Sequence, residues 1–352
     1  MLDLRNLDAW KAIRAPFLTG LALSIALLLL PLAALGDAPG AAEAQPTPGL
    51  LTLPAVPTPA AVPEPSPGEW DSSQTLRVLG RDGQVAEMTM ADYLWCVVAA
   101  EMPATFEPEA LRAQAVCART YSLWKLQAKS HEADGADICA DSSCCQAFLS
   151  REDAAQRWGE GSASAYTAKI ASAVADTDGQ VLTYDGGPIQ AVFFSSASGA
   201  TEDASAVWGK ALPYLVSVDS PEGDEVPNYR STVTLTADQV KKTVSEAGLD
   251  SDLSGDPSGW FANLTRTASG RVASVELGGV ALSGSAARNL FALRSACFDV
   301  AEADGVFTFS VTGYGHGVGM SQYGANAMAR AGSGWREILA HYYTGAQLQS
   351  AA

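Results

Sequence analysis

Residues 93–121 read YLWCVVAAEMPATFEPEALRAQAVCARTY, and this stretch decides how the folded part of the chain is organised. Its first half is a continuous apolar run, which predicts a helix that Asp92 caps and that ends near Glu101. Pro103 stops this helix, because the residue before a proline is pushed out of the α region. A second helix is expected over 108–127, since proline is favoured in a first turn and small or apolar residues follow at helical spacing.

Short strands and further helices flank this helical pair. Strands are expected at 76–79, 85–90, 181–184, 190–194, 232–235, 272–277 and 306–311. Further helices are expected at 163–174, 238–247, 320–331 and 335–343. Strands and helices do not alternate as βαβ units, so we expect an α+β fold with a mixed sheet and helices around a substrate groove. Residues 230–290 are expected to form an insert subdomain.

The composition limits the class of protein. The chain has 352 residues, 47% of them hydrophobic and 17% charged, with a formal net charge of −17. The length suggests about two domains, and the apolar content argues against wholesale disorder. The acidic balance argues against nucleic acid as a partner and against simple electrostatic adhesion to anionic lipid, because both need surplus Lys and Arg. Six cysteines are too few for a disulfide scaffold at this length.

The N-terminal region is expected to anchor the protein in a membrane. Residues 1–14 hold three basic side chains and form a predicted cytoplasmic tail, and residues 15–36 are uncharged and long enough to span a bilayer. A cleaved signal peptide is the alternative, although the apolar run is long for one. Residues 37–69 contain nine prolines, which predicts an extended linker. Residues 70–352 are then the extracytoplasmic folded domain.

Glu101 is the first candidate for chemistry. It ends a predicted helix whose preceding residues are apolar. Apolar surroundings and the negative end of the helix dipole both disfavour the carboxylate, so they raise the pKa of Glu101 as a general acid requires. A surface glutamate at a helix end is the alternative. Arg112 and Arg119 share one face of the second helix, where they could hold an anionic or hydroxyl-rich ligand or simply pair with Glu109.

A loop rich in cysteine predicts a metal site. His131, Cys139, Cys144 and Cys145 fall within about 15 residues, and thiolate and imidazole ligands suit a tetrahedral structural zinc. A disulfide from Cys139 to Cys144 or Cys145 is the alternative in an extracytoplasmic protein. Cys144 and Cys145 are adjacent and awkward to bridge to each other, which favours the metal. A closed site of this kind is structural, because it leaves no position for a catalytic water.

Two polar loops offer groups that suit a sugar. Residues 313–325 read GYGHGVGMSQYGA, which fits neither a Walker loop nor a dinucleotide-binding turn. Its His316, Gln322 and Tyr323 can hydrogen-bond to a sugar, and a tight turn with a satisfied histidine is the alternative. Residues 195–202 follow an apolar strand, as a binding loop at a strand end would. A Ser–His nucleophile pair with His316 is conceivable there, but an elbow motif and an orienting Asp are missing.

These residues together resemble the stage II sporulation protein D family, whose domain is shared with amidase-enhancer proteins. The resemblance is carried by residues 93–103 and 109–121 and by further segments in the same order, at 139–146, 195–203, 213–215, 282–298, 315–325 and 341–345. It covers essentially the whole region from 76 to 345. One position departs from the family pattern, because Cys144 stands where Cys-x4-His-Cys-Gln has histidine.

The resemblance implies a lytic transglycosylase that cleaves peptidoglycan glycan strands after their peptides have been removed. Glu101 looks like its acid/base. It would protonate the glycosidic oxygen of the MurNAc–GlcNAc bond and then take the proton of the MurNAc C6 hydroxyl, which closes onto C1 to give a 1,6-anhydro product. One carboxylate suffices because the nucleophile belongs to the substrate, whereas ordinary glycoside hydrolysis uses two.

The resemblance also implies a set of site residues, partners and a location. The residues expected to contact the glycan or to organise Glu101 are Arg112, Arg119, Ser198, Tyr214, His316, Gln322 and Tyr323. The implied partners are glycan strands, a stage II sporulation protein P-type amidase/endopeptidase and a membrane scaffold protein, at the mother-cell membrane of the engulfing septum. A non-catalytic amidase enhancer is the main alternative, and the Glu-Met-Pro context of Glu101 favours the enzyme. A zinc-dependent hydrolase is disfavoured by the Cys-rich ligand set.

Overall fold

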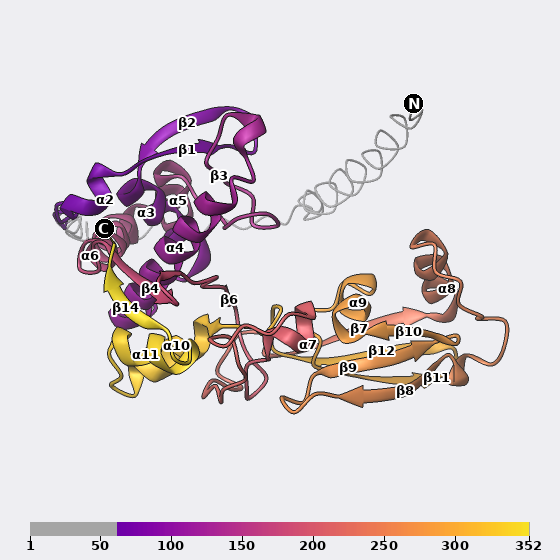
Figure 1. Ribbon diagram of the computed structural model, residues 1–352. Helices are drawn as coiled ribbons and strands as arrows, with labels where there is room; N and C mark the ends of the chain where they lie inside the picture. Colours follow the sequence, from indigo (N-terminus) through magenta and orange to yellow (C-terminus); the bar gives the residue numbers. More distant parts are fainter. Residues whose placement is uncertain (1–61, 352) are drawn as a thin grey trace, which may run out of the picture. The chain divides into compact units, whose positions relative to one another are not determined.

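The computed structural model describes residues 62–351, in which helices and short strands follow one another irregularly (Figure 1). The helices are α2 Glu69–Ser73, α3 Met90–Glu101, α4 Pro108–Ala128, α5 Arg151–Trp158, α6 Glu160–Ala175, α7 Ala204–Trp208, α8 Ala237–Glu246, α9 Gly284–Leu290, α10 Gln322–Arg330 and α11 Trp335–Tyr342, with 3-10 turns η2 Glu132–Asp134 and η3 Pro257–Gly259. The predicted tail at 1–14, the anchor at 15–36 and most of the linker lie outside the described residues. Within 62–351, no helix is both long and apolar enough to cross a membrane.

The strands form several small sheets. They are β1 Thr75–Leu79, β2 Val85–Thr89, β3 Ile138–Cys139, β4 Gln180–Tyr184, β5 Gly187–Pro188, β6 Phe193–Phe194, β7 Arg230–Thr236, β8 Phe261–Arg266, β9 Val272–Leu277, β10 Val280–Ser283, β11 Phe298–Ala303, β12 Val306–Thr312, β13 Met320–Ser321 and β14 Gln347–Ser350. Their orders are β2-β1-β3, β10-β9-β8, β11-β12-β7, β13-β6 and β14-β4-β5. The α+β class is confirmed, and the prediction of one mixed sheet is wrong, because the strands are divided among sheets of two or three.

The helical pair α3 and α4 forms the centre of the first hydrophobic core. Both helices lie close to their predicted bounds, but the cap of α3 is Thr89 and not Asp92. The Thr89 side chain accepts from the backbone N–H of Asp92 at 3.1 Å, which satisfies one of the free donors of the first turn. Most of α4 is buried on several faces, and it packs against α3, α6, α10, α11 and β4.

The region from β7 to β12 has a hydrophobic core of its own. Sheets β10-β9-β8 and β11-β12-β7, with α8 and α9, enclose it (Figure 1). Four phenylalanine rings, at 261, 291, 307 and 309, pack against one another with centroid distances of 5.0–5.7 Å. The insert expected over 230–290 stays a prediction; β7 at its start pairs with β12, which lies beyond its end.

Alternate glycines carry the chain from β12 to β13 beside the segment 192–197. At Gly317 φ is +90°, and a Cβ atom would lie 2.4 Å from Cζ of Arg271. At Gly319 φ is +77°, and a Cβ atom would lie 2.1 Å from the Val192 carbonyl oxygen. Only glycine combines this backbone conformation with such close packing. Of the side chains between these glycines, Tyr314 and His316 line the cleft described next, whereas Val318 is buried in the core.

Candidate active site

A cleft of about 750 Å³ brings together segments that are far apart in the sequence. The C-terminal end of α3, the loop before α5, the segment around β6, α7, α9, the loop after β12 and the start of α10 all contribute. The lining side chains that can make polar or aromatic contacts are Glu101, Tyr121, Ser142, Ser143, Cys144, Cys145, Gln146, Gln190, Phe193, Phe194, Ser195, Trp208, Arg288, Tyr314, His316 and Gln322.

Glu101 lies partly buried in this cleft, and two N–H donors hold its carboxyl group. Its Oε1 accepts from the backbone N–H of Ala147 at 2.8 Å, and its Oε2 accepts from Nε2 of Gln322 at 3.3 Å. Burial raises the pKa of Glu101, and the two hydrogen bonds lower it by less. The pKa of Glu101 is therefore raised, as the sequence predicted, which is the direction that a general acid requires.

Gln322 is fixed by the residues around it. It is the first residue of α10, whose N-cap Ser321 accepts from the backbone N–H of Gly324. Ser321 also donates to the buried carboxylate of Glu222, which accepts in addition from the Ala197 N–H at 2.6 Å and from Ser220 at 2.6 Å. Sequence reasoning missed Glu222, because its partners come from three separate segments.

A second cavity of about 420 Å³ is also lined by Glu101. The two cavities share Ala100, Glu101, Ser195 and Gln322. The second one adds Arg157, Trp158 and Tyr323. Glu101 therefore lines both cavities.

Glu101 is the only acidic side chain that lines either cavity within residues 62–351. A two-carboxylate glycosidase needs a second acid at a defined separation across the substrate. The arrangement therefore suits a reaction in which one carboxyl group both gives and takes a proton.

His316 lines the cleft as a neutral group. Its Nδ1 accepts from the Val318 N–H at 3.1 Å, so Nε2 carries the proton and donates to the Phe193 carbonyl at 3.0 Å. Burial, with the nearby positive charges of Arg271 and Arg288, lowers the pKa of His316 to about 4. Both ring nitrogens are occupied, so the idea of a Ser–His nucleophile pair is wrong, and His316 offers the cleft only its ring.

The structure places four predicted site residues away from the cleft lining. Arg112 pairs with Glu109 and Asp176, and Arg119 is fully buried against Asp71, with oxygen–nitrogen distances of 2.5 and 2.7 Å. Neither arginine lines the cleft, and their expected role in contacting the glycan or organising Glu101 stays a prediction. Two others are also absent from the lining. They are Ser198, whose Oγ is buried without a partner, and Tyr214, whose hydroxyl accepts from Gln190 N–H at 3.3 Å.

Several lining residues escaped the sequence analysis. Trp208 and Tyr314 are 42% and 43% exposed, and Trp208 packs 5.6 Å from the His316 ring. Exposed aromatic rings of this kind suit the apolar face of a sugar. The sequence around Trp208, Tyr314 and Arg288 does not indicate that their side chains are exposed in a cleft. A sequence pattern alone therefore does not identify them.

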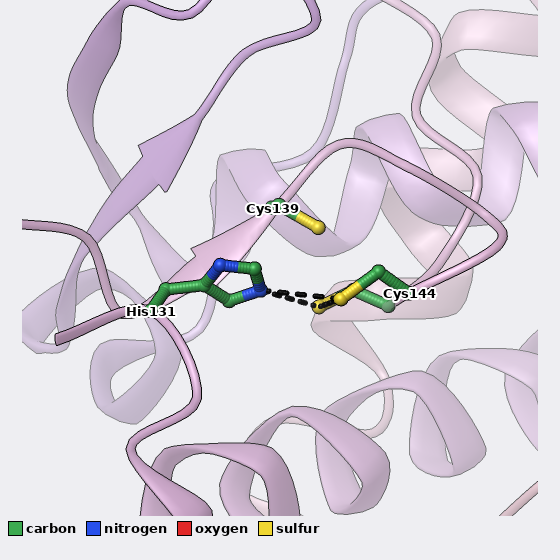
Figure 2. A group of neighbouring side chains, drawn as sticks. His131, Cys139 and Cys144 are labelled. Atoms are coloured by element: carbon green, nitrogen blue, oxygen red, sulfur yellow. Dashed lines mark hydrogen bonds between the residues drawn. The ribbon is translucent and has the colours of Figure 1, made fainter. Parts of the chain in front are cut away.

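The predicted metal ligands come together. The ligand atoms of His131, Cys139, Cys144 and Cys145 all lie within 4.8 Å of one another, and the four residues are the one such His/Cys cluster among the described residues. Figure 2 shows the His131 ring directed at the sulfur atoms. Its Nε2 lies 3.4 Å from Sγ of Cys144 and from Sγ of Cys145, and these two sulfur atoms are 3.8 Å apart.

These distances fit a tetrahedral zinc. Usual zinc bond lengths place nitrogen and sulfur ligands about 3.6 Å apart, and two sulfur ligands about 3.8 Å apart. The other ring nitrogen of His131 faces a carboxylate oxygen of Asp134 at 3.4 Å, which is how metal-bound histidines are commonly oriented. All three cysteines are free thiols, so the donor set is complete for a metal.

The loop that carries Cys144 and Cys145 is part of the cleft. Cys144 and Cys145 line the cavity, and Ala147, two residues further on, donates to Glu101. Gln146 fixes the loop to the helical pair, because its Nε2 donates to Ser122 at 3.1 Å and to Tyr93 at 3.4 Å. An ordered loop therefore holds one oxygen of the acid in place.

The fold and site define an α+β domain whose cleft presents a single shielded carboxylic acid beside a His/Cys loop. A family model described as Stage II sporulation protein (SpoIID) matches residues 80–184. Stage II sporulation protein D of Bacillus subtilis (strain 168) is 38% identical over 269 residues, and that of Bacillus amyloliquefaciens is 39% identical over 271 residues. Each alignment covers 76% of this chain and 76% of the relative.

An amidase enhancer of Bacillus subtilis (strain 168) is also similar, with 29% identity over 312 residues that cover 72% of this chain and 40% of the enhancer. The chain belongs to the stage II sporulation protein D family, a sporulation family to which amidase enhancers are related.

Proposed function

We propose that the protein is a lytic transglycosylase that cleaves MurNAc–GlcNAc bonds in peptide-stripped glycan strands of peptidoglycan during sporulation. The observation that carries this proposal is the single acid of the cleft: Glu101 lines both cavities, and no other Asp or Glu of residues 62–351 lines either of them. A reaction whose nucleophile is a hydroxyl of the substrate needs one such group.

The contacts of Glu101 support both halves of the reaction. In the first half, the protonated carboxyl gives its proton to the glycosidic oxygen as the bond to C1 of MurNAc breaks. In the second, the carboxylate takes the proton of the MurNAc C6 hydroxyl while that oxygen bonds to C1. Burial favours the protonated form at the start. The N–H groups of Ala147 and Gln322 stabilise the carboxylate formed between the two steps.

We also propose that His131, Cys139, Cys144 and Cys145 hold a structural zinc. The bound ion would hold the cysteines as thiolates and fix the loop. Without the ion the cysteines are thiols, because burial raises the pKa of Cys145 to about 12. The residues of this loop then keep the Ala147 N–H directed at Glu101.

The sequence outside the described residues supports a place for this activity. We propose that residues 15–36 anchor the protein in the mother-cell membrane at the engulfing septum, that 37–69 form a linker, and that 70–352 act on the wall. A stage II sporulation protein P-type amidase/endopeptidase, which would expose peptide-free glycan, and a membrane scaffold protein are the proposed partners.

The test incubates the full-length protein with peptide-free glycan strands and weighs the products. We expect fragments that end in 1,6-anhydroMurNAc, each lighter by one water than a hydrolytic fragment. Glu160→Gln, which changes an exposed glutamate, should give the same products. Reducing-end fragments would instead indicate hydrolysis. Tight binding of glycan without any cleavage would favour the amidase-enhancer function that the similarity to an amidase enhancer suggests.

A further inference from the structure

Three arginines without carboxylate partners gather around the loop that carries His316. They are Arg271, just before β9, Arg288 in α9, and Arg294, which follows α9. Within residues 62–351, no Asp or Glu oxygen lies within 4.0 Å of any of them. Arg288 lines the cleft, and Arg271 and Arg294 contact Gly315 and Tyr314, which also line it. In a chain with a net charge of −17, unpaired guanidinium groups beside a cleft require an explanation.

The contacts of the three arginines leave their donors largely unused. Arg288 lines the cleft and donates from Nε to the Arg294 carbonyl at 3.2 Å, so both of its terminal nitrogens remain for a ligand. The guanidinium of Arg294 lies 4.0 Å from the centre of the Tyr314 ring, and its buried Nε has no hydrogen-bond partner within residues 62–351. Arg271 is 2% exposed, and its Nε and Nη2 are buried without a partner among the described residues.

A buried guanidinium without an anion is unfavourable, because the charge has lost its hydration and gained no partner. The positive potential of this wall also reaches His316, which it helps to keep neutral. An anionic group on a ligand would complete the site. Among anions, a carboxylate matches the pair of terminal nitrogens of one guanidinium, since the two oxygens can accept side by side.

The proposed function supplies one such group. Each MurNAc residue carries a lactyl ether on O3, and its carboxyl group is amide-linked to the stem peptide in intact wall. In peptide-stripped glycan this carboxyl is free and negatively charged. Arg288 and the exposed ring of Tyr314 lie in the same cavity as Glu101, which is where a MurNAc residue next to the cleaved bond would be bound.

We propose that Arg288 binds the free lactyl carboxylate of MurNAc, with Arg271 and Arg294 adding positive potential behind it, so that the cleft selects glycan whose stem peptides have been removed. The assignment rests on the proposed function for the identity of the ligand. Charge would then distinguish the two forms of glycan. A lactyl group that is still amide-linked to its peptide has no negative charge and leaves Arg288 unpaired.

The test measures binding separately from cleavage. Full-length Glu101→Gln is titrated calorimetrically with peptide-free glycan fragments and with the same fragments after conversion of their lactyl carboxyls to methylamides. We expect the free acid to bind about 10- to 100-fold more tightly, as for a charge-assisted hydrogen-bonded pair. Equal affinities, or no binding of either glycan, would overturn the proposal.

Variants then assign the preference to a residue. Arg288→Gln should bring the two affinities to within about threefold of each other, Arg288→Lys should keep part of the difference, and Arg336→Gln, an exposed arginine of α11, should keep all of it. An undiminished preference in Arg288→Gln would refute the assignment. If the free acid binds preferentially but wild type cleaves neither glycan, the anion site stands and the transglycosylase function fails.

Discussion

In the helical part of the molecule the buried Arg119 is fully paired, whereas in the region from β7 to β12 the buried Arg271 has no carboxylate partner. Arg119 makes two hydrogen bonds to the carboxylate of Asp71, and neither side chain is exposed. Arg271 has one long contact, to the Gly315 carbonyl at 3.5 Å. The first arrangement is complete without a ligand and serves the fold. The second is incomplete, and it borders the cleft.

Glu101 differs from both buried arginines in how its charged group is held. It belongs to the helical part, yet N–H groups and not a cation hold it, so its charge is not neutralised by the protein. Buried charges in this molecule therefore divide into those paired within the fold and those without an oppositely charged partner among residues 62–351, which we propose serve the substrate. Variants of Glu101, Arg119 and Arg271, together with metal removal, test this distinction.

The largest effect is expected for Glu101→Gln. The amide cannot give a proton to the glycosidic oxygen, so cleavage of peptide-free glycan should fall by about 10³-fold or more. Thermal unfolding should show little loss of stability, because Gln is nearly the same size and the Gln322 side chain can turn its amide oxygen toward the new N–H. Cleavage by this variant at more than a tenth of the wild-type rate would remove Glu101 from the mechanism.

The next largest effect contrasts the two buried arginines. Arg119→Met leaves Asp71 as an unpaired buried charge, so the free energy of unfolding should fall by about 3–5 kcal/mol. Arg271→Met removes a charge that already lacks a partner, so the change should stay within about 1 kcal/mol. Urea unfolding of both full-length variants measures the difference. Equal losses of unfolding free energy would show that Arg119 does not stabilise the fold more than Arg271 does.

Metal removal should have a smaller effect on stability. If zinc is present at about 100 times its Kd, its loss lowers the free energy of unfolding by roughly 3 kcal/mol. Cys139→Ser should reproduce this loss and release the metal, whereas Cys297→Ser, outside the loop, should do neither. Elemental analysis and thermal unfolding are the measurements. A wild-type protein without metal, with a mass lower by two hydrogens, would instead identify a disulfide.

The smallest effect is the dependence of stability on pH through Glu101. Burial raises its pKa in the folded protein above the unfolded value of 4.5. The folded state therefore favours the protonated form, and the corresponding stability is present below pH 4.5 and is lost as the pH rises through the raised pKa. Glu101→Gln does not titrate, so its melting temperature relative to wild type should increase over this range and then level off. A difference in melting temperature that does not change with pH would contradict a raised pKa of the buried Glu101.

The sequence predicted the helical pair well, because its signals are local. Pro108 lies in the first turn of α4, and α3 ends at Glu101 before Pro103. The cap of α3 was misplaced by three residues, since Thr89 and Asp92 are both good cap residues and the choice depends on the strand β2 that ends at Thr89. Several elements between 150 and 303, such as α5, β8 and β11, gave no clear pattern because at most one residue of each is fully buried, so no continuous apolar face marks them.

The candidate site was predicted in part. Glu101, His316 and Gln322 do line one cleft, and the His/Cys cluster forms as expected. The spacing of Arg112 and Arg119 placed them on one helix face, and Glu109 was named as a possible partner of Arg112. The ion pairs of Arg112 with Asp176 and of Arg119 with Asp71 involve distant segments and could not be foreseen. The partners that an arginine finds, or lacks, are a property of the tertiary structure, so sequence reasoning could not separate these two from Arg288.

The most direct test of the account uses a glycan that cannot supply the nucleophile. Peptide-free strands are prepared with the MurNAc C6 hydroxyl methylated, and full-length wild type is incubated with methylated and unmodified strands under the same conditions. If the C6 hydroxyl is the nucleophile, we expect 1,6-anhydro ends from the unmodified strands and no cleavage of the methylated strands, although both bind. Cleavage of the methylated strands to reducing ends would show that water is the nucleophile and would contradict a reaction run by Glu101 and the substrate's own hydroxyl.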